Sequence, residues 1–126
     1  MIADFYLAPE HDKPEVDFKF SCHHLSLKGE SYPENAAQFY GPILAALRSY
    51  LDNTRDADIT VDIDLIYFNS SSTKILLSLF EMLDAAALVN KVQLNWHYDA
   101  EDETVREFGA DLADDFTNLI YNPVEK

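Results

Sequence analysis

Glycine, cysteine and basic residues are all scarce in this chain of 126 residues. It holds three glycines, one cysteine and nine Lys and Arg residues. The glycines, at positions 29, 41 and 109, lie too far apart for a G-x-G-x-x-G or G-x-x-x-x-G-K-[ST] loop. This excludes nucleotide-binding sites of those two kinds. The lone Cys22 has no disulfide partner in the chain and cannot form a CxxC zinc site.

The shortage of bases leaves a strong negative charge. Against 23 Asp and Glu residues, the nine bases give a formal net charge of −14. Such a chain repels both the phosphates of nucleic acids and anionic lipids, so neither nucleic acid nor membrane is an expected partner. Phe, Trp and Tyr make up 13% of the residues, which is typical of a folded protein and not of a disordered acidic one.

We expect neither a targeting segment nor a membrane-spanning segment in this sequence. Its N-terminus has no basic region followed by an apolar core, so a signal peptide is not expected. The most apolar stretch, residues 75–89, is interrupted by Glu81 and Asp84 and is too short to span a bilayer. With a single thiol and a length typical of one domain, residues 1–126 are predicted to form one soluble cytoplasmic domain.

Hydrophobic periodicity predicts alternating strands and helices. The clearest strand is 58–67, where Ile59, Val61 and Ile63 alternate with polar residues. The other expected elements are short strands at 2–8 and within 16–28, a helix from 33–35 to 51, a helix opening at 69–73 and running to 89, a strand at 91–98, a helix at 101–116 and a brief strand at 119–121. We therefore expect an α/β (α+β) fold, with a single mixed sheet of four to five strands covered by about three helices.

Asp62 and Asp64 lie on one face of the 58–67 strand, roughly 7 Å apart. With His97 they are candidates for a small-molecule or ion site, or for an acid–base pair of an enzyme; a solvated polar strand face is the alternative. His23 and His24 are adjacent in a strand and point to opposite faces, so they cannot share a metal ion. No G-x-S-x-G motif occurs, and we expect no catalytic residue, no cofactor and no metal.

The polar run Asn69–Thr73 is the most informative local feature. One hydroxyl suffices to cap a helix, yet four follow one another here. A phosphorylation site is the functional interpretation, because the positive end of a helix and its free N–H groups can hold a phosphate. Serine-rich helix starts are common, so simple capping remains the alternative at this point.

Three segments together resemble the SiaC family of bacterial regulatory phosphoproteins. They are Gly-Glu-Ser-Tyr-Pro-Glu-Asn (29–35), Asp-Ile-Asp-Leu-Ile-Tyr-Phe-Asn-Ser-Ser-Ser-Thr-Lys (62–74) and Trp-His-Tyr-Asp (96–99). Their order and separations match over about residues 25–99. The resemblance implies a fold like that of the STAS-type anti-sigma-factor antagonists. It also implies a non-enzymatic switch that a dedicated protein kinase phosphorylates and a PP2C-like phosphatase restores.

The resemblance further implies that the unphosphorylated form binds and activates a diguanylate cyclase, which raises cyclic-di-GMP and promotes biofilm formation. An anti-sigma factor as the regulated partner is the alternative. The family's acceptor threonine corresponds here to Ser70, with Ser71 and Ser72 as less favoured neighbours. The partner would dock around that residue, on the surface that includes Tyr67, Asn69, Ser71, Thr73 and Lys74. Lys74, one turn further on, could pair with the phosphate.

The negative charge is concentrated near the C-terminus. Residues 99–115 hold eight Asp and Glu residues and one base, Arg106, which gives −7. Since the apolar stripe of the predicted helix 101–116 should face inward, we expect these acids on its solvent face. Solubility explains them, and electrostatic steering of a basic partner is the sharper alternative.

Overall fold

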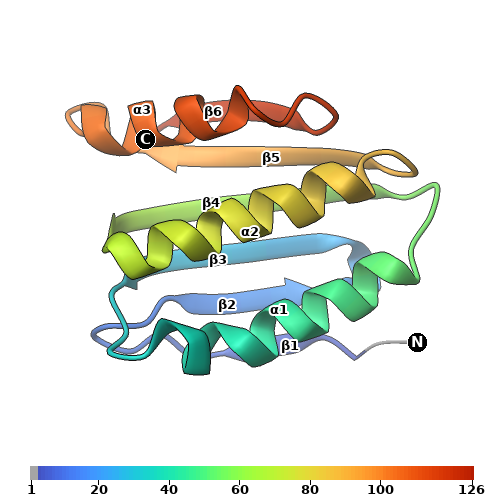
Figure 1. Cartoon of the computed structure of the whole chain (residues 1–126), viewed down its shortest axis with the longest axis horizontal. Coiled ribbons are helices and arrows are strands. Elements are labelled where there is room, and N and C mark those ends of the chain that lie inside the picture. Colours follow the sequence, from blue (N-terminus) through green and yellow to red (C-terminus); the bar gives the residue numbers. More distant parts are fainter. Residues whose placement is uncertain (1–2) are drawn as a thin grey trace.

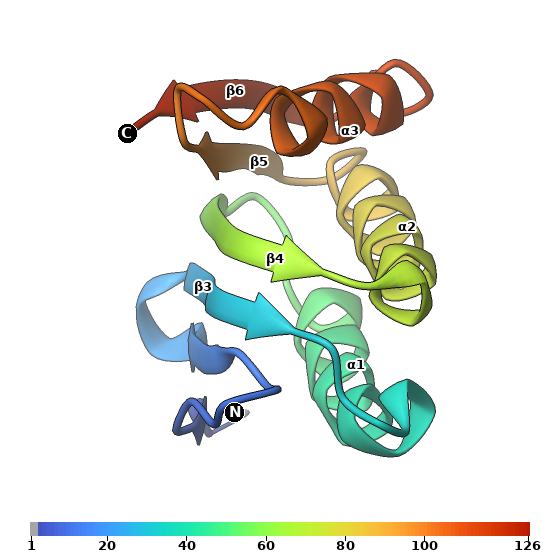
Figure 2. The same cartoon turned by 90° about the vertical axis from the view of Figure 1, so that its left-hand side faces the viewer.

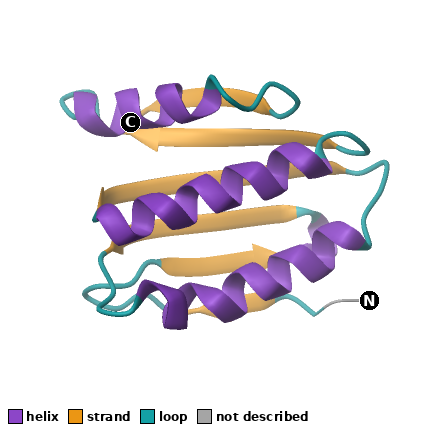
Figure 3. Ribbon diagram, viewed as in Figure 1, coloured by secondary structure: helices purple, strands orange, loops and turns teal. Residues whose placement is uncertain are grey.

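The computed structural model describes residues 3–126, which form one six-stranded sheet and three α-helices (Figures 1 and 3). The strands are β1 (Phe5–Leu7), β2 (Glu15–Lys19), β3 (His24–Ser31), β4 (Asp58–Phe68), β5 (Lys91–Tyr98) and β6 (Ile120–Glu125). The helices are α1 (Ala36–Asp52), α2 (Ser70–Ala86) and α3 (Glu103–Ala113), and a short 3-10 turn, Phe20–Cys22, joins β2 to β3.

The strands lie in the sheet in the order in which they occur in the sequence. β1, β2 and β3 pair antiparallel, whereas β3, β4, β5 and β6 pair parallel. Each pair of neighbouring parallel strands is connected by one helix. All three helices cover the same side of the sheet (Figure 2). The predicted mixed sheet is confirmed: β2 and β3 form an antiparallel hairpin, and three strand–helix–strand connections join parallel strands.

The prediction of four to five strands was too low, because both edge strands are weakly marked in the sequence. β1 has three residues within the predicted 2–8 segment, of which residue 2 lies outside the described part of the chain. β6 runs to Glu125 although it contains Pro123. Proline cannot donate a hydrogen bond to a neighbouring strand, but at the sheet edge only one neighbour has to be satisfied.

All three helices begin with the same cap. The side-chain oxygens of Asn35, Asn69 and Asp102 each accept a hydrogen bond at 3.1 Å from the backbone N–H three residues later. Such a cap satisfies one of the N–H groups that a helix start leaves without a partner. The helices consequently start at residues 36, 70 and 103, within a few residues of the predicted positions.

The core lies between the helices and the covered face of the sheet. β4 buries every second side chain, namely Ile59, Val61, Ile63 and Leu65. The predicted apolar faces of the helices meet them, with Leu47 of α1 and Phe80 of α2 fully buried. None of the helices in residues 3–126 is both long and apolar enough to cross a membrane.

The third helix places its acids outward, as predicted. Val105 is buried against the sheet, whereas Glu103, Glu107 and Asp111 are exposed. The helix ends at Ala113, three residues short of the predicted end.

Gly109 allows α3 to pack closely on β5 and β6. A Cβ atom at this position would lie 2.5 Å from Trp96 Nε1 and 2.5 Å from the Tyr121 hydroxyl. Real Cβ atoms do not approach other atoms so closely, so a side chain here would push the helix away from the sheet. The Tyr121 hydroxyl is itself buried and has no hydrogen-bond partner in the described chain.

We predict that Gly109→Ala destabilises the protein by about 1–3 kcal/mol, because it overpacks this contact. Urea unfolding measures the change. Tyr121→Phe should be neutral or stabilising by itself, since it removes an unsatisfied hydroxyl, and should recover part of the Gly109→Ala loss. Gly41→Ala is the control, because its methyl would meet no atom within 4 Å outside its own helix and chain neighbours. Equal effects at positions 41 and 109 would contradict the packing argument.

Candidate functional site

The polar run 69–73 forms the first turn of α2, directly after β4. Ser70 and Ser71 are exposed, Thr73 is half-buried and Ser72 is buried. The cap is the amide of Asn69, not one of the hydroxyls. The Thr73 hydroxyl donates to the carbonyl oxygen of Ser70 at 2.6 Å. Capping therefore does not occupy the hydroxyl of Ser70 or of Ser71.

Ser72 belongs to a buried hydrogen-bond network. Its hydroxyl donates to the backbone oxygen of Ser31 at 3.0 Å and lies 2.8 Å from the Ser31 hydroxyl, which in turn lies 2.5 Å from the Tyr40 hydroxyl. Burial raises the pKa of Tyr40 to about 12, more than the hydrogen bond with Ser31 lowers it, so this phenol stays protonated at neutral pH. Ser72 is 1% exposed, which places its hydroxyl out of reach of a kinase in the folded protein.

The starts of α1 and α2 lie next to each other and enclose a shallow cleft beside Ser70. The cleft is lined by Glu34, Asn35, Ala36, Ala37, Ser70, Ser71, Lys74 and Ile75. Lys74 is exposed and lies one helical turn after Ser70, on the same side of α2. An anion on Ser70 would thus have a cation beside it on α2 and an acid, Glu34, across the cleft.

A β-bulge exposes apolar side chains next to this turn. Gly29 pairs with Leu65 but Glu30 pairs with Tyr67, so β4 has one extra residue, Ile66. The extra residue reverses the alternation, and Phe68 turns to the helix side, where its ring lies 5.0 Å from that of Phe108.

Ile66 and Tyr67 consequently point outward, 63% and 51% exposed, and the Tyr67 ring lies 5.8 Å from that of Tyr32. Tyr32, Ile66 and Tyr67 form what we call the apolar patch. Exposed apolar residues gathered in this way are typical of a protein-binding surface.

The structure brings two of the predicted partner-binding residues, Ser71 and Lys74, to the same cleft as Ser70. Tyr67 is exposed three residues before Ser70, and Thr73 is partly accessible. Asn69 is half-buried and has a structural role in the cap. The exposure of Ile66 could not be predicted from the sequence, because it results from a bulge that depends on pairing between strands.

The alternative site around Asp62 lies on the opposite, helix-free face of the sheet. The Asp62 carboxylate accepts hydrogen bonds from His97 at 2.8 Å, His24 at 2.7 Å and Asn95 at 3.0 Å. Burial by itself would raise the pKa of Asp62, but the hydrogen bonds from both imidazoles and from Asn95 outweigh it and hold this pKa below its ordinary value.

Asp64 does not join this cluster, because its carboxylate pairs with Lys126 Nζ at 2.6 Å. Sequence reasoning missed His24, whose place beside Asp62 follows from the β3–β4 register. In residues 3–126 no group of three or more His, Cys, Asp or Glu residues is arranged to hold a metal ion. The Asp62 and Asp64 carboxylates thus pair with side chains of neighbouring strands and of the C-terminal residue, as is common on a polar strand face.

Comparison with known families agrees with the resemblance seen in the sequence. The model of the SiaC family of regulatory phosphoproteins matches residues 7–126. The chain belongs to the SiaC family. A protein of Pseudomonas aeruginosa strain UCBPP-PA14 is 28% identical over 116 residues, which are 90% of either chain.

Solved structures of SiaC from Pseudomonas aeruginosa share the fold of this SiaC-family protein. The apo form superposes with a TM-score of 0.86 at 24% identity, covering 96% of this chain and 98% of that one. A complex of the diguanylate cyclase SiaD with its activator SiaC gives a TM-score of 0.89 at 25% identity, covering 98% and 100%. In that complex the relative is a cyclase activator.

We predict that Ser72→Ala destabilises the protein by about 1–3 kcal/mol, because it removes one member of a buried hydrogen-bond network. Thermal and urea unfolding give the change. Ser71→Ala is the matched control one residue earlier; its side chain is exposed, and the expected change is within about 0.5 kcal/mol. If both variants unfold like wild type, the network does not hold the start of α2.

A second prediction concerns Asp62. Because its pKa is lower in the folded than in the unfolded chain, its charge stabilises the fold above the ordinary carboxyl pKa of about 3.9, and this contribution is lost as the pH falls through the folded value. Asp62→Asn should cost about 1–2 kcal/mol at neutral pH and progressively less in acid. Asp58→Asn, on an exposed side chain of the same strand, is the control. A loss that stays constant down to about pH 3 would refute this account.

Proposed function

We propose that this SiaC-family protein is a switch without catalytic activity, phosphorylated on Ser70, whose unphosphorylated form binds and activates a diguanylate cyclase. The observation that carries the proposal is an exposed serine hydroxyl at the start of α2, free of the cap and three residues after Tyr67 of the apolar patch. The family consists of regulatory phosphoproteins, and the relative in the cyclase complex is named as an activator.

The helix start favours a phosphate on Ser70. The first N–H groups of a helix lack partners within the helix, and the helix dipole is positive at this end. Ser71 is exposed too, but Ser70 comes first in the helix and is the residue that corresponds to the acceptor threonine in the resemblance. Lys74 adds a cation one turn away.

The same phosphate would oppose docking of a partner on the apolar patch. Apolar contacts at the centre of an interface depend on excluding water, and a phosphate of about −1.5 to −2 charges keeps its water. Glu34, across the cleft, adds like-charge repulsion when a partner closes over the site. We therefore expect the kinase to switch the cyclase off and a PP2C-like phosphatase to restore activation. Both would act in the cytoplasm.

We predict that Ser70→Asp weakens binding to the host's diguanylate cyclase, and activation of it, at least tenfold, about 1.4 kcal/mol, whereas Ser70→Ala binds like wild type. Titration calorimetry and cyclic-di-GMP production measure the two effects. Thr104→Asp is the control, because it adds the same charge at an exposed hydroxyl residue of α3, outside the cleft, and should retain the binding. Phosphopeptide mass spectrometry of protein from host cells should place the phosphate on Ser70.

The outcomes separate the alternatives. If Ser70→Ala and Ser70→Asp both bind like wild type and residues 70–73 carry no phosphate in the host, the proposal is wrong. If the variants change binding to an anti-sigma factor and leave the cyclase unaffected, the same switch serves the other partner class. A phosphate found on Ser71 in protein from host cells, with none on Ser70, would move the acceptor to Ser71.

A further inference from the structure

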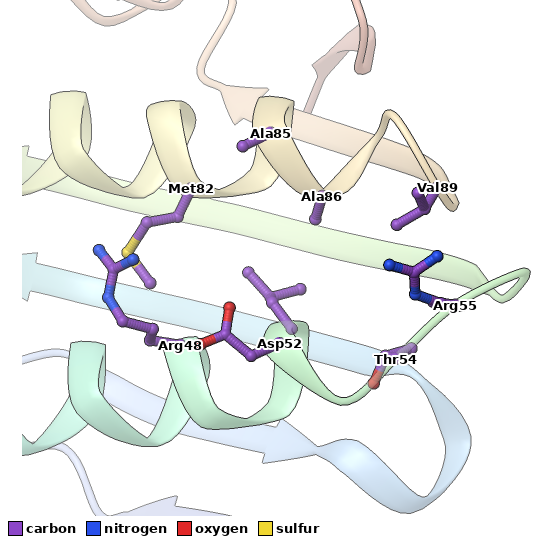
Figure 4. A pocket seen from close by; sticks show the side chains of 9 residues that line it. Arg48, Asp52, Thr54, Arg55, Met82, Ala85, Ala86 and Val89 are labelled. Carbon is purple, nitrogen blue, oxygen red and sulfur yellow. The ribbon is translucent and has the colours of Figure 1, made fainter.

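A pocket of about 250 Å³ opens between the C-terminal parts of α1 and α2 (Figure 4). Part of its lining is apolar: Leu51 and Ala86 are almost fully buried, Met82 is half-buried, and Val89 is 39% exposed. It lies at the far end of the helix pair from the proposed phosphorylation site. Met82 comes twelve residues after Ser70, which is about 18 Å along the helix axis.

Two arginines flank this lining. Arg48 and Arg55 extend toward the pocket from opposite sides in Figure 4, with Asp52 between them. In a chain with 23 acids and nine bases, an arginine has many potential partners. Nevertheless, neither arginine forms an ion pair within 4.0 Å in residues 3–126. Arg106 on α3 forms no ion pair in this part of the chain either, but only Arg48 and Arg55 flank this partly apolar opening.

The positions of Arg48 and Arg55 are not explained by stabilisation of the helix dipole of α1. Cations stabilise a helix when they lie in its last turn, and the last turn of α1 contains no base. Arg48 lies before that turn, and Arg55 lies beyond the Asn53 cap.

We propose that this pocket binds an acidic, amphipathic peptide segment of a partner protein. Its carboxylates would pair with Arg48 and Arg55, since a guanidinium matches a carboxylate with two parallel hydrogen bonds. An apolar side chain between the acids would cover Met82 and Val89. The Asp52 carboxylate would accept an N–H from the segment.

A compact anion such as inorganic phosphate fits the pocket less well. The carbonyl ends of α1 and α2 both lie here, and Asp52 contributes a negative charge between the two arginines. A ligand can contact all of these groups only if its negative charges are far enough apart to reach both arginines. Between those charges it needs apolar surface for Met82 and Val89 and an N–H donor for Asp52. At physiological ionic strength the screening length is about 8 Å, so the acids of α3 repel such a segment little, whereas the two arginines are in contact with it.

The experiment uses the full chain and a synthetic peptide in which pairs of Glu alternate with pairs of Leu. Titration followed by ¹⁵N–¹H NMR should show saturable binding, with the largest shifts at Arg48, Arg55 and Met82. The peptide with Lys in place of every Glu, and the one with Ala in place of every Leu, should each bind at least tenfold more weakly. Arg48→Glu and Arg55→Glu should each weaken binding at least tenfold as well.

Arg106→Glu is the matched control, because it makes the same charge change on an exposed arginine of α3 and should leave binding unchanged. Each of three results would overturn the proposal: no binding of the Glu–Leu peptide, equal binding of the Lys peptide, or equal losses in all three arginine variants. Self-association of the chain that Arg48→Glu and Arg55→Glu abolish, without peptide binding, would assign the pocket to a second copy and overturn it too. None of these results depends on Ser70.

Discussion

The contacts of one buried serine, Ser31, connect the elements that form the candidate site. Its backbone oxygen accepts hydrogen bonds from the Asn69 N–H and the Ser72 hydroxyl, and its own hydroxyl reaches Tyr40 of α1. The end of β3 therefore holds both helix starts at once. The exposed position of Ser70 is a consequence, because the hydroxyl two residues later is committed to the interior.

The elements could be predicted because their signals are local. Alternating residues such as Ile59, Val61 and Ile63 mark a strand wherever it pairs, and apolar spacing of three and four marks α1 and α2. The edge strands could not be delimited, since a three-residue β1 has no period to detect and Pro123 argues against a strand everywhere except at an edge.

The site could be predicted only in part, because its finer features depend on contacts between distant residues. The run 69–73 predicted a special helix start, but its four hydroxyls look alike in sequence. In the structure Ser72 pairs with Ser31, 41 residues away, and Thr73 donates to the Ser70 carbonyl, whereas Ser70 and Ser71 stay exposed. The bulge at Ile66 requires the β3–β4 register, and the contact of His24 with Asp62 spans 38 residues. Local periodicity contains no information on such pairs.

The packing of Trp96 gives the molecule a built-in optical reporter. It is the chain's single tryptophan and is 1% exposed. Its ring lies 6.3 Å from that of Phe68, two residues before Ser70, and 6.1 Å from that of Phe108 on α3. The emission of one fluorophore therefore reports, without any label, on the strand–helix junction that leads into α2 and on the packing of the acidic helix α3.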